Sequence, residues 1–358
     1  MSSYTSLPGG LSAYGWDDEL ERAFAHHRTA GLVPARIAAV DRGRCDAVTE
    51  TGPLRAGTSQ VKTADPVASP CTGDWAAVRP GAEPEIAALL PRRSVIVRSS
   101  PSRRSHGQAL AANVDTVAVV SSLATASNPG RVERLLALAW ESGAVPVLVL
   151  TKADAVADPT RSADDAARLA PGVSVIATSA ETGLGLDALA GVLTGTVVLL
   201  GPSGAGKSTL GNALLGAEVL ATGAVRAQDG KGRHTTVRRE LVPLPNGGVL
   251  IDTPGLRGIG LVDADDGLQQ VFAEIEELAG DCRFADCSHE REPGCAVQAA
   301  IASGELDQRR LASYRKLQRE NEWATSRSDA RAQREDVKKA ITRSLRQTYA
   351  FRDRQRRS

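Results

Sequence analysis

The feature that most constrains this chain is the glycine-rich octapeptide GPSGAGKS, residues 201–208. It matches G-x-x-x-x-G-K-[ST] and lies where that motif needs to lie, directly after an apolar run and before a helical pattern. In such a loop the backbone amides surround a β-phosphate, Lys207 reaches the β- and γ-phosphate oxygens and Ser208 ligates Mg²⁺. A glycine-rich turn that binds nothing has no need of Lys and Ser at these positions. The segment therefore predicts nucleotide binding.

The surrounding sequence alternates between strand and helix patterns. Continuous Val- and Leu-rich runs are typical of strands that are buried on both faces. These runs cover residues 116–120, 145–150, 173–178 and 196–200. Helical patterns separate them at residues 131–142, 164–170 and 186–193. The alternation predicts an α/β fold with one doubly wound sheet, and a further strand is expected just before Asp252.

A second phosphate-side motif, DTPG, begins at Asp252. We expect the Asp252 carboxylate to hold Mg²⁺, directly or through water, and the amide of Gly255 to meet the γ-phosphate. Between the loop and DTPG lies GRHTT, residues 232–236, in a glycine-rich segment expected to close on the γ-phosphate and supply a threonine to Mg²⁺. Spacing does not say whether Thr235 or Thr236 is that ligand.

Two polar segments predict which base is bound. TKAD begins at Thr151, directly after the apolar run 145–150, and TSA begins at Thr178, after the next run. The Asp154 carboxylate is placed to accept hydrogen bonds from N1–H and the exocyclic amine of guanine, an edge that adenine does not offer. We expect Lys152 to lie along the base and a TSA amide to lie near the guanine carbonyl. Alone, TKAD is an ordinary polar strand end; with TSA one β-α unit later, it predicts guanine over adenine.

The order of these motifs is permuted. In an ordinary G domain the phosphate loop comes first and the guanine motifs come last, whereas here TKAD and TSA precede the loop. A parallel sheet tolerates this order because strands that are neighbours in the sheet need not be neighbours in sequence. The segment after DTPG therefore leads into a cysteine-bearing C-terminal region. A nucleotide-dependent movement of that segment is tied to this region by the chain itself.

Together the motifs closely resemble the ribosome small-subunit-dependent GTPase A family (RsgA type), circularly permuted GTPases that help mature the small ribosomal subunit. The resemblance covers nearly all of the chain from about residue 31. It is carried by AANVD at residues 111–115, TKAD, TSA, GPSGAGKST, GRHTT, DTPG and a Cys/His cluster. It implies an N-terminal OB-fold domain, which agrees with the short β-like runs of residues 32–79, typical of a small antiparallel barrel.

We therefore expect four segments along the chain. They are an N-terminal extension at residues 1–30, an OB-fold β-barrel at 31–95, a circularly permuted GTPase domain at 96–264, and a helical zinc-binding domain with a basic tail at 265–358. An amphipathic stretch of the extension, residues 16–27, is expected to pack on a neighbouring domain. The residues expected to bind GTP are Thr151, Lys152, Ala153, Asp154, Ser179, Ala180, Gly201, Pro202, Ser203, Gly204, Ala205, Gly206, Lys207, Ser208, Thr209 and Gly255.

One residue departs from the family pattern. The guanine motif usually begins with Asn, which bridges the base and the phosphate loop, whereas this chain has Thr151. Asp154 still carries the discrimination for guanine. The replacement therefore puts nucleotide affinity in doubt more than base choice.

Three cysteines and a histidine lie close together in the C-terminal region. They are Cys282, Cys287, His289 and Cys295. Cys₃His is a structural zinc set with closed, tetrahedral coordination, although the spacing alone leaves buried or free cysteines as the alternative. The resemblance carries the same four positions and implies one structural Zn²⁺. Cys45 and Cys71 lie far from this cluster, and we expect both in the core of the barrel.

Hydrolysis requires a group that orients water in line with the γ-phosphate, commonly a Gln just after D-x-x-G. Here that position holds Leu256, an apolar residue that cannot activate water, so intrinsic turnover is expected to be slow. His234, inside GRHTT, is our candidate for orienting the water, and Lys207 is the other catalytic candidate. The alternative for His234 is that it packs against the protein or contacts RNA.

Charge is distributed unevenly along the chain. Residues 305–358 hold 16 Lys and Arg against 8 Asp and Glu, a net charge of +8, whereas the whole chain carries +1. Basic helix faces bind RNA phosphates, although many charge runs are simply solvated surface. Next to a zinc module and an OB-like barrel, the tail predicts contact with rRNA.

The sequence therefore predicts a GTP hydrolase that binds the small ribosomal subunit and acts in its late maturation, with hydrolysis stimulated by the subunit. The alternative is a nucleotide-gated RNA-binding switch with negligible hydrolysis, and TKAD and TSA disfavour an ATP-using P-loop enzyme. The start MSSYTSLPGG lacks a basic segment followed by an apolar run, and no stretch approaches the ~18 apolar residues of a membrane span. We expect a cytoplasmic monomer with no membrane partner.

Overall fold

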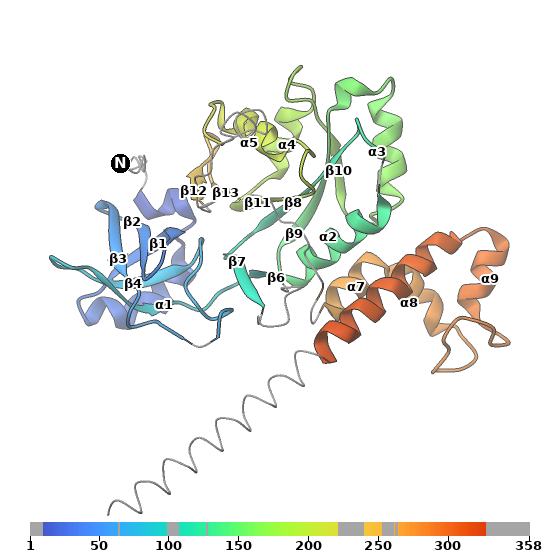
Figure 1. Ribbon diagram of the computed structural model, residues 1–358, viewed down its shortest axis with the longest axis horizontal. Coiled ribbons are helices and arrows are strands. Elements are labelled where there is room, and N and C mark those ends of the chain that lie inside the picture. The colour runs from blue at the N-terminus through green and yellow to red at the C-terminus, as the bar shows by residue number, and fades with distance from the viewer. Residues whose placement is uncertain are drawn as a thin grey trace, which may run out of the picture.

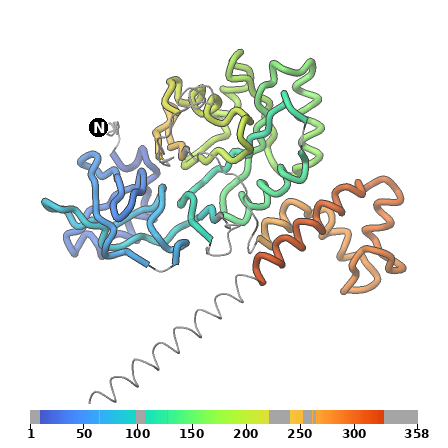
Figure 2. The backbone as a smooth tube through the Cα atoms, in the orientation of Figure 1, coloured from blue at the N-terminus to red at the C-terminus, as the bar shows by residue number. Residues whose placement is uncertain are grey.

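The computed structural model describes residues 10–63, 65–98, 107–126, 128–220, 240–252, 261 and 264–326. Along the chain these residues form a small β-barrel, a central sheet covered by helices, and a helical C-terminal part, which follow one another from blue to red in Figure 1. The backbone tube in Figure 2 shows that the barrel and the C-terminal helices adjoin the sheet part at two different sides. The sheet part thus lies between the barrel and the C-terminal helices and contacts both.

Five short strands close into the N-terminal barrel. They are β1 (Val33–Val40), β2 (Arg44–Thr49), β3 (Gly52–Gly57), β4 (Trp75–Arg79) and β5 (Glu85–Leu89). They pair in the order β1-β2-β3-β5-β4, and β4 closes the barrel on β1. Small and β-branched side chains such as Ile37, Cys45 and Ile86 fill the interior. The expected barrel is confirmed, although it is not wholly antiparallel because β3 and β5 pair in parallel.

The N-terminal segment packs on the barrel. It forms η1 (Gly10–Tyr14) and α1 (Asp18–Thr29). The Asp17 carboxylate caps the N-terminus of α1, and Arg93 donates to both of its oxygens at 2.6 and 2.8 Å. These hydrogen bonds lower the pKa of Asp17 to about 2. The Trp16 and Trp75 rings meet edge to face at 4.9 Å, so the amphipathic stretch expected here is a helix fixed to the barrel.

The central sheet has six strands in the order β10-β9-β8-β11-β13-β12. They are β8 (Thr116–Ser122), β9 (Val145–Thr151), β10 (Ser174–Ala177), β11 (Thr196–Leu200), β12 (Glu240–Pro243) and β13 (Val249–Asp252). All neighbouring pairs are parallel except β12 with β13 at the edge. The predicted doubly wound sheet is confirmed, and its apolar strands are buried under helices on both faces.

Among the described residues, four helices connect these strands. They are α2 (Pro129–Glu141), α3 (Pro159–Ala167), α4 (Leu186–Val192) and α5 (Lys207–Leu215). Asn128 and Asp158 cap the first two helices, and each is followed by a proline, which suits a helix start. Because the strands are parallel, the loops after them meet at one edge of the sheet, where ligands bind in open α/β folds.

A two-stranded ribbon links the barrel to the sheet. It consists of β6 (Val95–Arg98) and β7 (Gln108–Ala112). Cys45 lies in the barrel core as expected. The prediction for Cys71 is wrong: this residue packs against Ala109 and Ala112 of the ribbon. It belongs to the segment between β3 and β4, which leaves the barrel and lies against β7.

The C-terminal part is helical. It contains α7 (Asp265–Val271), α8 (Ala273–Gly280), α9 (Ala296–Ser303) and a longer helix that begins at residue 308 and is described up to residue 326. Helix α7 packs along α2 of the sheet part. No helix in the described part of the chain is both long enough and apolar enough to cross a membrane. The basic tail beyond residue 326 lies outside the described residues.

Candidate functional site

The phosphate loop joins the end of β11 to the start of α5. Gly201 lies against β8, and a Cβ there would come within 2.4 Å of the Val120 carbonyl oxygen, so a larger residue does not fit. Gly206 has a φ of 88°, in the left-handed region that favours glycine. Because α5 begins at Lys207, the last residues of the loop also form a helix N-terminus. This is the arrangement that binds phosphate in other proteins.

Lys207 lies folded over this loop. Its Nζ donates to the carbonyl oxygens of Gly201 and Pro202, both at 2.8 Å. Phosphate oxygens are charged, and charge-assisted hydrogen bonds are roughly twice as strong as neutral ones. A phosphate in the loop would therefore compete well with the two carbonyls for the donors of Lys207.

The two segments predicted to read the base lie next to each other at the same edge of the sheet. The Ser179 hydroxyl donates to the Asp154 carboxylate, and the Ala153 amide donates to the Thr178 carbonyl at 3.0 Å. Thr178 and Ser179 are fully buried, whereas Asp154 is exposed. The structure thus joins TKAD to TSA and orients the Asp154 carboxylate, leaving this residue open to solvent.

The base segment is also bonded to the phosphate loop. Lys152 has a φ of 58°, and its Nζ donates to the Gly204 carbonyl at 3.2 Å. The Thr151 hydroxyl donates to the Ala205 carbonyl at 2.6 Å. The other predicted GTP-binding residues described here lie in the same loop, at the start of α5 or after β10: Pro202, Ser203, Ser208, Thr209 and Ala180. Segments far apart in sequence therefore form one continuous edge.

The γ-phosphate side of this edge is described only in part. Asp252 is the last residue of β13, which pairs with β11, so its backbone lies near the start of the phosphate loop. The side chain of Asp252 lies outside the described part of the structure, as do five further predicted residues. These are His234, Thr235, Thr236, Gly255 and Leu256. Their roles stay predictions.

The three cysteines and the histidine of the C-terminal part converge on one point. Their potential ligand atoms all lie within 4.8 Å of one another. The sulfurs of Cys282 and Cys295 are 3.9 Å apart, and each is 3.5 Å from Nδ1 of His289. A tetrahedral Zn²⁺ with bonds of ~2.3 Å to sulfur and ~2.0 Å to nitrogen requires edges of about 3.8 and 3.5 Å. Cys282, Cys287, His289 and Cys295 thus fit this metal.

Local structure places these ligands. Cys295 is the N-cap of α9, where its sulfur accepts the Gln298 amide at 3.4 Å. His289 has a φ of 58°, and its carbonyl accepts a hydrogen bond from the Gln298 side chain. A set of four protein ligands leaves no open position for a substrate. A metal here would therefore stabilise the segment between α8 and α9 instead of taking part in catalysis.

Sequence reasoning missed the residues that join the barrel to the sheet. Arg36 projects from β1 with its side chain fully buried and donates to the Thr196 hydroxyl at 2.9 Å. Burial lowers the pKa of Arg36 to about 10. Asn113, the central residue of AANVD, has a φ of 52°; its side-chain amide donates to the Gly73 carbonyl and its oxygen accepts the Arg93 amide, both at 3.0 Å. The AANVD motif is therefore the joint between the two parts, and its Asn suits a left-handed position.

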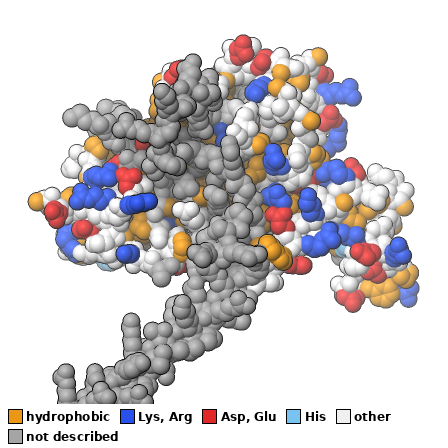
Figure 3. Space-filling model, in the orientation of Figure 1, with side chains coloured by type: hydrophobic (Ala, Val, Ile, Leu, Met, Phe, Trp, Pro, Cys, Tyr) orange, Lys and Arg blue, Asp and Glu red, His pale blue; other side chains and the backbone are white. Residues whose placement is uncertain are grey.

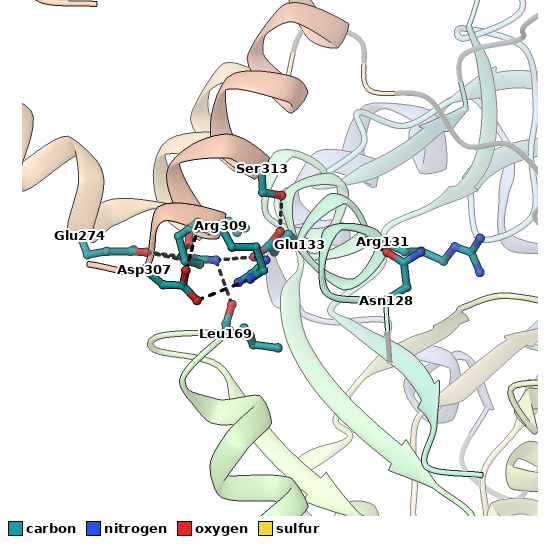
Figure 4. Close-up of polar contacts among 10 residues, drawn as sticks. Asn128, Arg131, Glu133, Leu169, Glu274, Asp307, Arg309 and Ser313 are labelled. Carbon is teal, nitrogen blue, oxygen red and sulfur yellow. Dashed lines mark hydrogen bonds and ion pairs between the residues drawn. The ribbon is translucent and has the colours of Figure 1, made fainter. Parts of the chain in front are cut away.

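A buried ion cluster joins the C-terminal helices to α2 (Figure 4). Glu133 of α2 has a side chain that is 0% exposed and accepts hydrogen bonds from Arg309, Arg310 and Ser313. The Arg310 side chain is 5% exposed, and its N–H groups make five hydrogen bonds. The acceptors are the carboxylates of Glu133 and Glu274 and the carbonyl oxygens of Leu169 and Val271. One arginine thus connects four segments.

Helix α7 also packs against α2, next to this ion cluster. The Asn321 side chain accepts the Ala264 amide at 3.0 Å and donates to Asp265 at 2.8 Å, so it caps α7 from the last described helix. Gly267 lies so close to α2 that a Cβ would come within 2.1 Å of the Ala137 carbonyl oxygen. The chain after DTPG therefore enters a helix fixed to both α2 and the C-terminal helices.

Comparisons with known proteins agree with this arrangement. A family model described as RsgA GTPase matches residues 89–262. A protein of Streptomyces coelicolor, the Small ribosomal subunit biogenesis GTPase RsgA, is 58% identical over 347 residues, which are 96% of this chain and 94% of that protein. The protein of the same name from Streptomyces avermitilis is 56% identical over 345 residues, with 93% of each chain covered.

Two solved structures resemble the fold. YjeQ from Thermotoga maritima has a TM-score of 0.57 at 23% identity, over 80% of this chain and 97% of that chain. YloQ, described as a circularly permuted GTPase, has a TM-score of 0.56 at 22% identity, over 80% of this chain and 93% of that chain. The likeness shows a permuted fold, in agreement with a phosphate loop that follows the fourth strand of the sheet along the chain.

Proposed function

Because the chain belongs to the RsgA GTPase family, we propose that it hydrolyses GTP while bound to the small ribosomal subunit and acts in that subunit's late maturation. GTP hydrolysis to GDP and phosphate is the activity of the family, and the chain is an enzyme of this kind. The relatives named for small ribosomal subunit biogenesis support the choice of partner. A switch with negligible hydrolysis is not favoured.

The observation that carries the nucleotide assignment is the meeting of three segments at one edge of the sheet. Lys152 bonds to the phosphate loop at Gly204, and Ser179 orients Asp154. A guanine held by Asp154 would lie beside the loop that holds its phosphates, and adenine would offer Asp154 no matching donor pair. The proposed GTP-binding site consists of the residues predicted from TKAD, TSA, the phosphate loop and DTPG, some of which position others.

GTPases use Mg²⁺ together with GTP. The proposed ligands are the hydroxyl of Ser208, the carboxylate of Asp252 and the hydroxyl of Thr235 or Thr236, all hard oxygen donors of the kind that Mg²⁺ prefers. When bound, the ion supplies positive charge that offsets the charge developing on the phosphate oxygens. Lys207 adds a second positive charge from the protein, and His234 is proposed to orient the attacking water.

The permuted order gives the nucleotide site a route to the ribosome-facing part. The segment after DTPG leads into α7, which Asn321 and Gly267 hold against the C-terminal helices and α2. We infer that the state of the nucleotide reaches the proposed zinc-binding domain, residues 265–358, along this path. The other proposed segments are the extension 1–30, the OB-fold domain 31–95 and the GTPase domain 96–264.

Basic side chains support contact with rRNA. On the face drawn in Figure 3, Lys and Arg gather over the sheet helices and the C-terminal helices, with acidic side chains among them. Lys316 and Arg319 of the last described helix are exposed, and the strongly basic sequence of residues 327–358 follows them. Such residues neutralise RNA phosphates, and binding should weaken as salt is added. We propose a cytoplasmic monomer that binds rRNA.

Purified small subunits are expected to raise phosphate release from GTP by roughly 10²-fold and to leave ATP turnover unchanged, since a positioned water-orienting group contributes on the order of 10²–10⁴. The measurement is steady-state phosphate release with each nucleotide, with and without subunits. Large ribosomal subunits serve as the control. Equal rates with and without small subunits would contradict the proposal.

The same assay tests His234. If this residue orients the water, His234→Ala reduces the stimulated rate while GTP affinity is preserved. If the variant keeps the full stimulated rate, the assignment of His234 as the water-orienting residue fails.

The metal assignment predicts one zinc per chain in the purified protein. Cys295→Ser is expected to reduce the bound zinc well below one per chain, because the hydroxyl of Ser is a poor ligand for this ion. Cys45→Ala is the control, since burial raises the pKa of the Cys45 thiol to about 12 and keeps it out of metal chemistry. Zinc content is measured by elemental analysis. Unchanged zinc in Cys295→Ser would rule out this ligand set.

A further inference from the structure

Thr151 occupies the position where the guanine motif usually has Asn. Its side chain is nearly enclosed, since the residue is 5% exposed. The hydroxyl oxygen lies 2.6 Å from the Ala205 carbonyl oxygen and 3.3 Å from that of Ser121. A hydroxyl has one proton to donate. The shorter distance assigns that proton to Ala205, inside the phosphate loop.

The bonded carbonyl has a defined place in the loop. Ala205 is buried, and its peptide group carries the amide of Gly206, the residue with a φ of 88° directly before α5. A Cβ on Gly206 would lie 3.4 Å from the Thr151 hydroxyl oxygen. Thr151 therefore packs against the turn that directs the last loop amides. A hydrogen bond to the Ala205 carbonyl fixes the plane of that peptide and hence the direction of the Gly206 N–H.

Chemistry separates Thr from Asn at this place. An Asn amide has two protons, so it can serve the loop carbonyl and one acceptor of guanine on its N7 edge at the same time. Thr151 has a single proton, and the loop uses it. Its remaining groups are a methyl group and hydroxyl lone pairs, which offer nothing to the acceptor N7.

We propose that Thr151 is a positioning residue that orders the phosphate loop without contacting the base, and that it thereby makes guanine nucleotides leave faster than Asn would in its place. The proposal rests on the nucleotide site described above. With Thr at this position, the hydrogen bond to the phosphate loop is retained and the hydrogen bond to the base is lost. Faster release would suit an enzyme that must discharge GDP after each round on its partner.

Three variants of Thr151 distinguish the hydrogen bond to the phosphate loop from a hydrogen bond to the base. Thr151→Val removes the hydroxyl at nearly constant shape and leaves the buried Ala205 carbonyl without its donor. Thr151→Ser keeps the hydroxyl, and Thr151→Asn adds a second proton. The probe is a fluorescent GDP analogue, whose dissociation rate is measured by chase with unlabelled GDP. The melting temperature without nucleotide shows that each variant is folded.

We expect release to be about tenfold faster from Thr151→Val, in line with the loss of one buried hydrogen bond. Thr151→Ser should stay within about twofold of the parent protein, and Thr151→Asn should release about tenfold more slowly. Release from Thr151→Val as slow as from the parent would overturn the loop-ordering role. Release from Thr151→Asn no slower than from the parent would overturn the contrast with Asn.

Competition with 7-deaza-GDP, which lacks the N7 acceptor, tests the absence of a base contact. The ratio of the dissociation constants for GDP and 7-deaza-GDP should be the same in the parent protein and in Thr151→Val. A ratio that changes between the two would show that Thr151 reads N7 and would overturn the proposal. If the parent protein bound ADP in preference to GDP, the guanine assignment itself would fail. This result is distinct from every outcome of the Thr151 variants, which change the rate of GDP release and not the choice of base.

Discussion

Replacing Asp154 by Asn is expected to convert the protein from a GTP-binding to a xanthosine triphosphate-binding form. Asp154 accepts a hydrogen bond from the Ser179 hydroxyl and is open to solvent on its other side. In the proposed complex it accepts from N1–H and the exocyclic amine of guanine. An Asn amide would instead face that amine with its own N–H donors, whereas xanthine offers an oxygen at the same place.

The expected effect is large. A site built to hydrogen-bond one group rejects an analogue lacking it by a factor on the order of 10⁴. The ratio of the GTP and xanthosine triphosphate dissociation constants should therefore change by roughly 10⁴-fold in Asp154→Asn. Equilibrium binding of both nucleotides measures this ratio, and subunit-stimulated phosphate release follows it.

A matched control lies four residues further along the chain. Asp158 caps α3 by accepting the Arg161 amide at 2.9 Å, and Asn is as good a cap as Asp. Asp158→Asn thus makes the same change of charge near the site and should leave base choice untouched. Asp154→Asn with an unchanged preference for GTP would sink the guanine assignment, whatever Asp158→Asn does.

The sheet and the residues at its edge could be predicted because their signals are local. A buried strand followed by GPSGAGKS specifies a loop and a helix N-terminus within about a dozen residues. TKAD and TSA each follow an apolar run, and parallel strands bring their carboxyl ends together. The order of the strands could not be read in this way, yet the edge at which the motifs meet did not depend on it.

The contacts that join the barrel and the C-terminal helices to the sheet part have no local sequence pattern of this kind. Arg36 meets Thr196 and Arg310 meets Glu133 across more than 150 residues of sequence. In each case the sequence shows only a charged residue in an amphipathic pattern, which is the usual appearance of a solvated surface position. Asn113 was visible as part of a motif, but its role depends on a left-handed backbone and on Gly73, a residue of another segment.

The zinc set illustrates a signal that is local but incomplete. Spacing alone left free or buried cysteines open for Cys282, Cys287 and Cys295. Distances decide the fit, because the sulfur and nitrogen separations match the edges of a tetrahedron. For Cys71, the expected burial is correct, but the residue lies against the ribbon of β6 and β7 instead of in the barrel core.

Replacing Arg310 by Met is expected to lower the free energy of opening of the C-terminal helices by about 3–5 kcal/mol, the usual cost of removing one partner of a buried ion pair. The cost arises on Glu133, whose carboxylate is fully buried on α2 and would lose a charged donor. The opening free energy is measured by native-state hydrogen exchange of the amides in residues 308–326. Figure 4 shows why the effect should be local to this junction, since the cluster lies between α2 and the C-terminal helices.

Arg309 provides the control within the same helix. It also donates to Glu133, at 3.0 Å, but its side chain is 36% exposed, so Arg309→Met should cost about 1 kcal/mol or less. In the double variant Glu133→Leu with Arg310→Met, the fully buried carboxylate of Glu133 is gone and only the partly exposed Glu274 loses its arginine, so part of the lost stability should return. Exchange in Arg310→Met within 1 kcal/mol of the parent would show that the cluster does not hold the helices in place.

The functional consequence of Arg310→Met distinguishes docking from nucleotide binding. The hydrogen bonds of Thr151, Lys152 and Lys207 that hold the phosphate loop and the guanine segments lie at the edge of the sheet, so affinity for GDP should be unchanged. Helix α7, in contrast, follows DTPG along the chain, and the carbonyl oxygen of its last residue, Val271, accepts a hydrogen bond from Arg310. If the permuted chain relays the nucleotide state through this junction, as proposed, the variant should bind GTP normally and lose most of the increase in phosphate release that small subunits produce.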